Sequence, residues 1–271
     1  MTREQAQSVL TQIGEAGEED FPLIDAALAC AVHEDPNRDA DAVRQLCDQM
    51  AERLAGRLAH ESPEEALAET LCGDFRFAGD LITFDHPDNA DIIAVAQRRK
   101  GIPVALGIFY LETARRCGMK VDGVDFPGHF LLRVETSEGP LALDPFSEGR
   151  VVLPSELTRR ALRAGLTPDV ADRLDLLMAP VRARSVLIRL QNNIFARAQA
   201  RRDFGAAERS ALRRALLDPV DHRPWLDVAA AREGQGRLAG ALEALGRAQQ
   251  LDGGVAIAAR AARERVRMRL N

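Results

Sequence analysis

Two side chains that could exchange a proton occur close together near the middle of the sequence. His129 opens an alternating strand pattern, HFLLRVE, and Asp144 lies near the end of the next one, LALDPF. A carboxylate beside an imidazole fixes the tautomer of the ring and raises its basicity, as in a catalytic triad. The pair therefore predicts general-base chemistry. The structural alternative is that the two groups only tie a hairpin together.

The apolar residues of these two strands predict how the hairpin pairs. A turn around residues 137–139 makes the strands antiparallel, and the pairing with odd sums of residue numbers gathers the large apolar side chains on one face. The even pairing would bury Asp144 among them, an uncompensated charge. We therefore expect His129 and Asp144 on the opposite face, directly across or diagonal, where backbones lie about 7–8 Å apart. The expected core face consists of Phe130, Leu132, Val134, Leu141 and Leu143.

A triad also needs a nucleophile within hydrogen-bond distance of its base. The apolar helix VALGIFYLETARRCG follows the break at Gly101, and its first residues, Pro103, Val104 and Ala105, carry no nucleophilic group. Cys117 lies at the other end of that helix, about 18 Å from Ala105 at a rise of 1.5 Å per residue. The sequence therefore predicts a base and its orienting acid without a nucleophile.

The elements around this pair predict an α+β domain. Residues 1–100 show mainly helical apolar spacing, with expected capping boxes at Thr2 with Gln5 and at Ser62 with Glu65. One apolar helix and three short strands, VDGVDF, HFLLRVE and LALDPF, then form a helix followed by an antiparallel meander. Pro154 opens helical sequence that continues to the C-terminus.

The C-terminal third repeats itself at an offset of 34 residues, which is the tetratricopeptide period. Trp225 lies where the aromatic residue that opens such a repeat belongs, and a plain helical hairpin is the alternative. Two repeats are too few for a free-standing solenoid, so we expect them to pack on the first domain. The identical pairs are Ala207 with Ala241, Arg213 with Arg247, Leu217 with Leu251 and Asp218 with Asp252. Further consensus positions fall on Val228, Ala229, Gly236, Ala241, Leu245 and Ala248.

The segment RRKGIPVALGIFYLETARRCGMKVDGVDFPGHFLLRVE, followed by LALDPF, resembles the SirB N-terminal family of transglutaminase-like proteins. The resemblance covers roughly residues 20–150, and the helical tail with LIRLQNNI is also similar to full-length members. It implies a Cys at the start of the core helix as nucleophile, a His as base and an Asp that orients it. His129 and Asp144 match the last two roles, and the nucleophile position near Pro103, Val104 and Ala105 is empty.

The expected fold class is α+β. It has a transglutaminase- or papain-like core of one helix and a small antiparallel sheet, a helical N-terminal region and a C-terminal tetratricopeptide-like repeat pair. We expect two domains: residues 1–155, which hold the helical N-terminus and the transglutaminase-like part, and residues 156–271, which hold the helical repeats.

Composition excludes several other classes. A net charge of −5 and a pI near 5.7 argue against nucleic acid as the main partner. The four cysteines form no C-x-x-C pair, and no phosphate-binding loop occurs, so no cofactor is expected. His129 and Asp144, even with His86 or Asp125, do not specify a metal, so no metal site is expected. The charged N-terminus and the lack of a long apolar run predict a cytoplasmic chain that does not enter a membrane.

Two functions are compatible with these residues. In the first, the chain is a non-catalytic relative of a thiol enzyme, a pseudoenzyme that binds a protein or peptide. Gly101 and Gly128 would then contribute to the cleft, with Gly128 allowing another backbone to approach closely, and Trp225 would contribute to the repeat groove. In the second, a hydrolase of the peptidase or amidase kind uses His129, oriented by Asp144, as general base on water.

Overall fold

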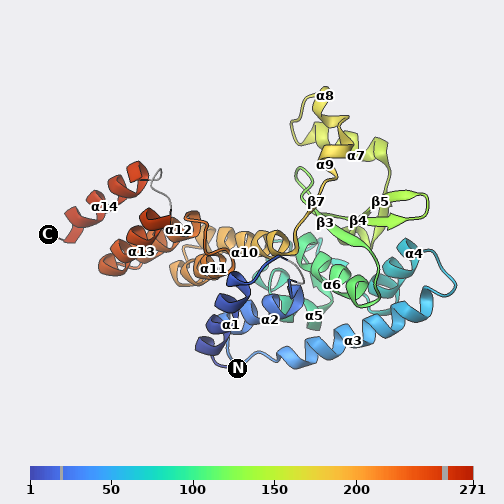
Figure 1. The fold of residues 1–271 in the computed structure, drawn as a ribbon, viewed down its shortest axis with the longest axis horizontal. Coiled ribbons are helices and arrows are strands. Elements are labelled where there is room, and N and C mark those ends of the chain that lie inside the picture. Colours follow the sequence, from blue (N-terminus) through green and yellow to red (C-terminus); the bar gives the residue numbers. More distant parts are fainter. Residues whose placement is uncertain (19–20, 252–255, 271) are drawn as a thin grey trace. The chain divides into compact units, whose positions relative to one another are not determined.

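The computed structural model describes residues 1–18, 21–251 and 256–270, and the chain divides into two compact units. The sheet unit is Arg38–Leu187, and the helical unit combines Met1–Asn37 with Ile188–Asn271. Figure 1 shows the elements of both units, coloured from blue at the N-terminus to red at the C-terminus. This division differs from the predicted split at residue 155. Residues after 155 complete the sheet unit, and the first two helices pack with the C-terminal ones.

The helical unit begins with α1 (Arg3–Glu15) and α2 (Leu23–Glu34). Both elements of the predicted capping box are present at Thr2 and Gln5. The first helix packs on α2 and on α11 (Phe204–Leu217). At Gly14 the helix approaches α11 so closely that a Cβ atom would lie 1.8 Å from the Leu216 carbonyl oxygen. The N-terminal helices therefore extend the C-terminal helical array.

Among the C-terminal helices of this unit, α11 and α13 (Leu238–Leu251) are related by the predicted 34-residue spacing. The others are α10 (Ala183–Ala200), which crosses the boundary between the units, α12 (Arg223–Gly234) and α14 (Ala256–Leu270). Each of α11 to α14 packs on the next, and α13 begins and ends 34 residues after α11. Of the expected consensus residues, Val228, Ala229, Ala241, Leu245 and Ala248 join one buried cluster with Trp225. Gly236 has a positive φ of 74° between two helices, and Asp252 lies outside the described residues.

The sheet unit opens with helices, and one predicted cap is wrong. The Ser62 hydroxyl donates to the Glu65 carboxylate at 3.0 Å, and the helix that follows has no side-chain cap.

Across the described residues, no helix combines the length and apolar character needed to cross a bilayer. The first elements of the sheet unit are α3 (Ala40–Arg57), α4 (Pro63–Ala68), the π-helix η1 (Glu69–Asp74), β1 (Ala78–Gly79), the 3₁₀-helix η2 (Pro87–Asn89), α5 (Ile92–Arg98) and β2 (Lys100–Gly101).

The second half of the sheet unit contains the predicted helix and meander and adds two strands that sequence patterns missed. The five-stranded sheet is antiparallel throughout, in the order β6-β5-β4-β3-β7. Its elements are α6 (Pro103–Arg116), β3 (Val121–Val124), β4 (Leu131–Thr136), β5 (Gly139–Asp144), the 3₁₀-helix η3 (Pro145–Ser147), β6 (Arg150–Val152) and β7 (Pro180–Val181). After the end of α6, Gly118 adopts a left-handed conformation with φ 69°.

The hairpin pairs in the predicted register. Leu132 lies opposite Leu143 and Val134 opposite Leu141, so the paired numbers sum to odd values. The expected core face packs toward α6, where a Cβ atom on Gly107 would lie 2.2 Å from the Phe130 ring. The register therefore puts Asp144 on the other face, as expected.

That other face is also buried, which the sequence did not predict. Three short helices cover it: α7 (Pro154–Arg163), α8 (Pro168–Ala171) and α9 (Leu174–Leu177). Leu131 and Ala142 of the hairpin pack there with Leu157 and Ala161 of α7. The helical sequence that opens at Pro154 therefore belongs first to the sheet unit, and only residues from 188 onward belong to the helical unit.

Candidate functional site

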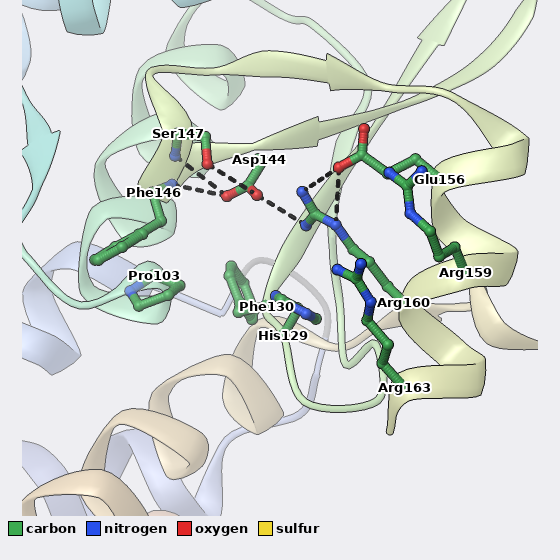
Figure 2. A pocket seen from close by; sticks show the side chains of 10 residues that line it. All are labelled: Pro103, His129, Phe130, Asp144, Phe146, Ser147, Glu156, Arg159, Arg160 and Arg163. Carbon is green, nitrogen blue, oxygen red and sulfur yellow. Dashed lines mark hydrogen bonds and ion pairs between the residues drawn. The ribbon is translucent and has the colours of Figure 1, made fainter. Parts of the chain in front are cut away.

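A cavity of about 320 Å³ lies where the start of α6, the loop before β4 and the helix α7 come together (Figure 2). We call it the His129 pocket. It brings together His129, Asp144 and Pro103, three of the residues that the sequence singled out. The other lining residues are Phe130, Phe146, Ser147, Glu156, Arg159, Arg160 and Arg163.

His129 lies in the turn that leads into β4. Its backbone N–H donates to the Phe126 carbonyl oxygen at 2.8 Å, and its side chain is half-buried. Gly128 before it has a positive φ of 73°, a conformation that glycine adopts without strain. The close backbone approach expected at Gly128 is absent from the described residues, because a Cβ atom there would meet open space. Glycine is needed at this position for the shape of the turn.

Asp144 has several hydrogen-bond partners of its own. Its carboxylate caps η3 by accepting from the backbone N–H groups of Phe146 at 3.1 Å and Ser147 at 3.3 Å. The Ser147 hydroxyl donates to the same carboxylate at 3.2 Å, and the Arg160 guanidinium at 2.8 Å. Figure 2 shows this arrangement beside His129. Asp144 and His129 thus share the pocket, and the role of Asp144 in orienting the imidazole stays a prediction.

Arg160 links Asp144 to a second carboxylate. Its guanidinium donates to Glu156 at 2.7 and 3.1 Å, and Arg150 donates to Glu156 from the other side at 2.8 and 3.0 Å. The hydrogen bonds from Arg150 and Arg160 lower the pKa of Glu156 to about 2. Both pocket carboxylates are therefore matched by guanidinium groups, and the pair of Arg160 with Asp144 is nearly buried.

The pKa of His129 is lowered from its ordinary value. Burial is the main cause, and the positive charge of Arg160 adds to it, while the carboxylates of Asp144 and Glu156 act in the opposite direction. This shift favours the neutral form of the imidazole. A neutral imidazole can accept a proton or a hydrogen bond.

The start of α6 supplies the pocket with no nucleophile. Pro103 lines the cavity, whereas Val104 and Ala105 are buried in the core. Cys72 and Cys117 lie outside the lining of the pocket, and burial raises the pKa of both thiols. The hydroxyl in the pocket belongs to Ser147, which sequence patterns did not mark. Its signal was the turn DPFSEG, which places a hydroxyl three residues after Asp144.

Sequence reasoning also missed the basic wall of the pocket. Arg159, Arg160 and Arg163 come from α7, a helix that was assigned to the second domain. Their signal was the spacing itself, because residues four apart lie on one face of a helix. Figure 2 shows the three guanidinium groups on one side of His129 and the rings of Pro103 and Phe146 on the other.

The two other predicted binding residues lie outside this pocket. Gly101 is buried in β2, where it pairs with Gly79 of β1. Trp225 belongs to the helical unit and lines a separate cavity of about 310 Å³ between α1, α11, α12 and α13. The Arg247 guanidinium lies 4.6 Å from the centre of the Trp225 ring. Their binding roles stay predictions.

The fold of the sheet unit agrees with a comparison against known protein families. The family described as "Transglutaminase-like superfamily" matches residues 40–192. The chain belongs to the transglutaminase-like superfamily. The match extends across nearly all of the sheet unit and includes α7, so the basic wall lies inside the transglutaminase-like domain.

Several similar proteins carry the name UPF0162 protein. A UPF0162 protein of Xylella fastidiosa (strain Temecula1) is 32% identical over 241 residues, covering 86% of this chain and 85% of its own length. A UPF0162 protein of Vibrio cholerae is 33% identical over 143 residues, covering 50% and 53%. F-box only protein 21 of Mus musculus is 30% identical over 100 residues, which cover 34% of this chain and 16% of that one. No solved structure matches the chain.

Proposed function

We propose that this transglutaminase-like protein is a non-catalytic binding module that holds a protein or peptide segment in the His129 pocket. One observation carries the proposal. The pocket keeps an imidazole and a carboxylate, but the helix start that faces them offers Pro103 in place of a nucleophile. Covalent thiol catalysis requires a thiolate beside the base. The narrower membership in the SirB N-terminal family belongs to the same proposal.

The cysteines of the sheet unit support a non-catalytic role. A catalytic thiol has a lowered pKa and lies in an electropositive, accessible place. Burial instead raises the pKa of Cys72 and of Cys117, and the Cys117 thiol donates to the Ala51 carbonyl oxygen at 3.2 Å. Neither sulfur belongs to the lining of the pocket.

The helical unit supplies a second docking surface in this proposal. The cavity at Trp225 lies among helices that recur at the tetratricopeptide spacing, and arrays of that kind bind extended or helical peptides on their concave face. Trp225 would contribute its ring face and Arg247 its charge. The repeat assignment itself is part of the proposal.

A hydrolase remains the second candidate because of the protonation state of His129. A general base must begin unprotonated, and burial together with Arg160 lowers the pKa of this imidazole. In that reading His129 removes a proton from water, and backbone N–H groups at the start of α6 stabilise the oxyanion.

The two candidates separate in a paired assay of the full chain. Wild-type protein and His129→Ala are incubated with fluorogenic peptidase and amidase substrates and with an amine-incorporation substrate. We expect no turnover that depends on His129. Peptides selected from a display library should bind the His129→Ala variant about tenfold more weakly, which is about 1.4 kcal/mol.

His60→Ala is the matched control, because His60 is an exposed residue outside the pocket. It should leave peptide affinity unchanged. Turnover that disappears in His129→Ala but persists in His60→Ala would replace the binding proposal with the hydrolase.

A further inference from the structure

Two guanidinium groups on the wall of the His129 pocket have no counter-charge. Arg159 and Arg163 are exposed and, within the described residues, neither side chain has an ion-pair or hydrogen-bond partner. Their neighbour Arg160 is different, since its guanidinium pairs with both Asp144 and Glu156. The lining residues therefore carry three positive charges against two negative ones, and with Arg150, which also pairs with Glu156, the positive excess is two.

Helix stability does not by itself account for these charges. Like charges four residues apart destabilise a helix by about 0.2–0.5 kcal/mol, and a cation in the last turn, such as Arg163, contributes about 0.3–1 kcal/mol in the opposite direction. The chain as a whole is acidic, with a net charge of −5. Arg159 and Arg163, two guanidinium groups without ion-pair partners among the described residues, line a cavity and are therefore suited to attracting an anion. The planar guanidinium fork matches the oxygens of a carboxylate or phosphate.

The opposite side of the pocket continues into an exposed apolar loop. Phe146 lines the pocket, and its ring packs edge-on against Phe84 with 5.8 Å between the ring centres. In the same loop the side chains of Leu81 and Ile82 are 82% and 89% exposed. These are large aliphatic side chains left almost wholly in water, which is how docking surfaces differ from ordinary surface.

The apolar loop is held in its shape by a buried carboxylate. Asp80 is almost completely buried and accepts hydrogen bonds from the backbone N–H groups of Ile82 at 3.2 Å and Thr83 at 2.9 Å, and from the Thr83 hydroxyl at 2.6 Å. The Asn89 side-chain amide donates to the Thr83 carbonyl oxygen at 2.6 Å. The exposure of Leu81 and Ile82 is therefore a feature of an organised loop, one that costs no reordering when a partner binds.

We propose that the His129 pocket recognises an oxyanion on a peptide side chain, a carboxylate or a phosphate, through Arg159 and Arg163, while apolar residues next to that side chain pack on Phe146 and the Leu81–Phe84 loop. This deepens the proposed binding function and rests on it for the peptide nature of the ligand. His129 contributes a neutral imidazole that hydrogen-bonds to the anion.

The anion site is tested first with simple ions. The pKa of His129 in the full chain is followed by NMR while acetate or inorganic phosphate is added. A bound anion stabilises the protonated imidazole, so the pKa of His129 should rise by several tenths, and the more effective ion identifies the oxyanion. In the Arg159→Gln/Arg163→Gln double variant the rise should be lost.

The control variant, Arg76→Gln/Lys120→Gln, removes two exposed positive charges outside the pocket and should keep the full response. Both Arg159 and Arg163 are exposed, so the fold of the double variant should be intact, and circular dichroism checks this. A His129 pKa that ignores both ions, or that responds equally in the double variant, overturns the proposal.

Peptides then separate this inference from the function beneath it. Library peptides that bind the full chain are compared with versions in which the acidic or phosphorylated residue is replaced by Gln. We expect about a tenfold loss of affinity in wild-type protein and no loss in the double variant. Leu81→Ser/Ile82→Ser should weaken both peptide forms equally. If ions bind but no peptide does, the proposed peptide-binding function is refuted and the anion site is supported. If peptides bind without any preference for an oxyanion, the anion site is refuted and the peptide-binding function is supported.

Discussion

At the scale of single residues, Arg160 decides the electrostatics of the pocket. Its guanidinium satisfies the carboxylate that the sequence assigned to His129, and its charge helps to keep the imidazole neutral. In a catalytic triad the carboxylate accepts a hydrogen bond from the imidazole N–H and so orients the ring. Here the carboxylate of Asp144 also caps η3 and pairs with α7, so it holds the pocket walls together.

Replacing Arg160 with Gln should change both stability and protonation. The nearly buried Asp144 loses a charge-assisted hydrogen bond but keeps those from Phe146 and Ser147, so the free energy of unfolding should fall by about 2 kcal/mol. The pKa of His129 should rise, because the cation that lowers it is gone while the carboxylates remain. Urea unfolding and an NMR titration measure the two effects. Arg159→Gln, one position earlier and without a partner in the described part of the chain, should change stability by less than about 0.5 kcal/mol. Equal effects of the two variants would contradict this role for Arg160.

At the scale of elements, the turn between η3 and β6 packs closely on the helices α4 and α6. Gly149 is buried with a positive φ of 69°, and a Cβ atom there would lie 2.8 Å from the Ala68 Cβ and 2.9 Å from the Tyr110 hydroxyl. Gly128, in the turn before His129, has a similar φ of 73° and open space around it. Replacing Gly128 therefore adds backbone strain alone, whereas replacing Gly149 adds both backbone strain and close packing.

Gly128→Ala should cost about 1 kcal/mol, the penalty of a left-handed conformation for a residue with a Cβ atom. Gly149→Ala should cost about 3 kcal/mol, because overpacking against α4 and α6 adds to the same strain. Urea denaturation followed by circular dichroism gives both free energies. If the two variants lost equal stability, the close packing of this turn on Tyr110 would be refuted.

The elements also separate what the sequence could predict from what it could not. The apolar alternation predicted β3, β4 and β5 and the odd register, since burying Asp144 in the core would have cost too much. β7 has two residues and β1 and β2 have two each, too short for any alternation to be visible. The pocket was predicted as far as His129, Asp144 and Pro103. Its arginines were missed because they come from α7, and no local pattern indicates that this helix returns to the sheet.

At the scale of the whole molecule, each unit contains one histidine whose pKa is lowered by burial, and the two serve different purposes. His129 is half-buried at a pocket, whereas His33 is buried inside the helical unit. Glu34 follows His33 and is held by Arg209 and Arg213 of α11. Burial alone would raise the pKa of Glu34, but the hydrogen bonds from Arg209 and the charge of Arg213 outweigh it and lower the pKa to about 2. This ion-pair cluster joins the N-terminal helices to α11.

The helical unit should lose stability in mildly acidic solution because of His33. Burial, with the positive charge of Arg213, lowers the pKa of His33 from 6.5 to about 4. Between those two values the unfolded chain binds a proton that the folded chain does not, so stability falls as pH drops from about 6.5 toward 4. The loss approaches about 3 kcal/mol. Glu34 contributes its own loss only at lower pH, between 4.5 and about 2.

Trp225 is the only tryptophan and lies in the buried cluster of the helical unit, so its fluorescence during urea unfolding follows that unit. The free energy of unfolding is measured at about pH 7.5, 6, 5 and 4.5. It should decline steadily in wild-type protein as the pH falls. His33→Leu, which cannot be protonated, should flatten the decline, and His60→Leu, at an exposed position in the sheet unit, should leave it unchanged. A decline that survives in His33→Leu would mean that other groups control the acid sensitivity.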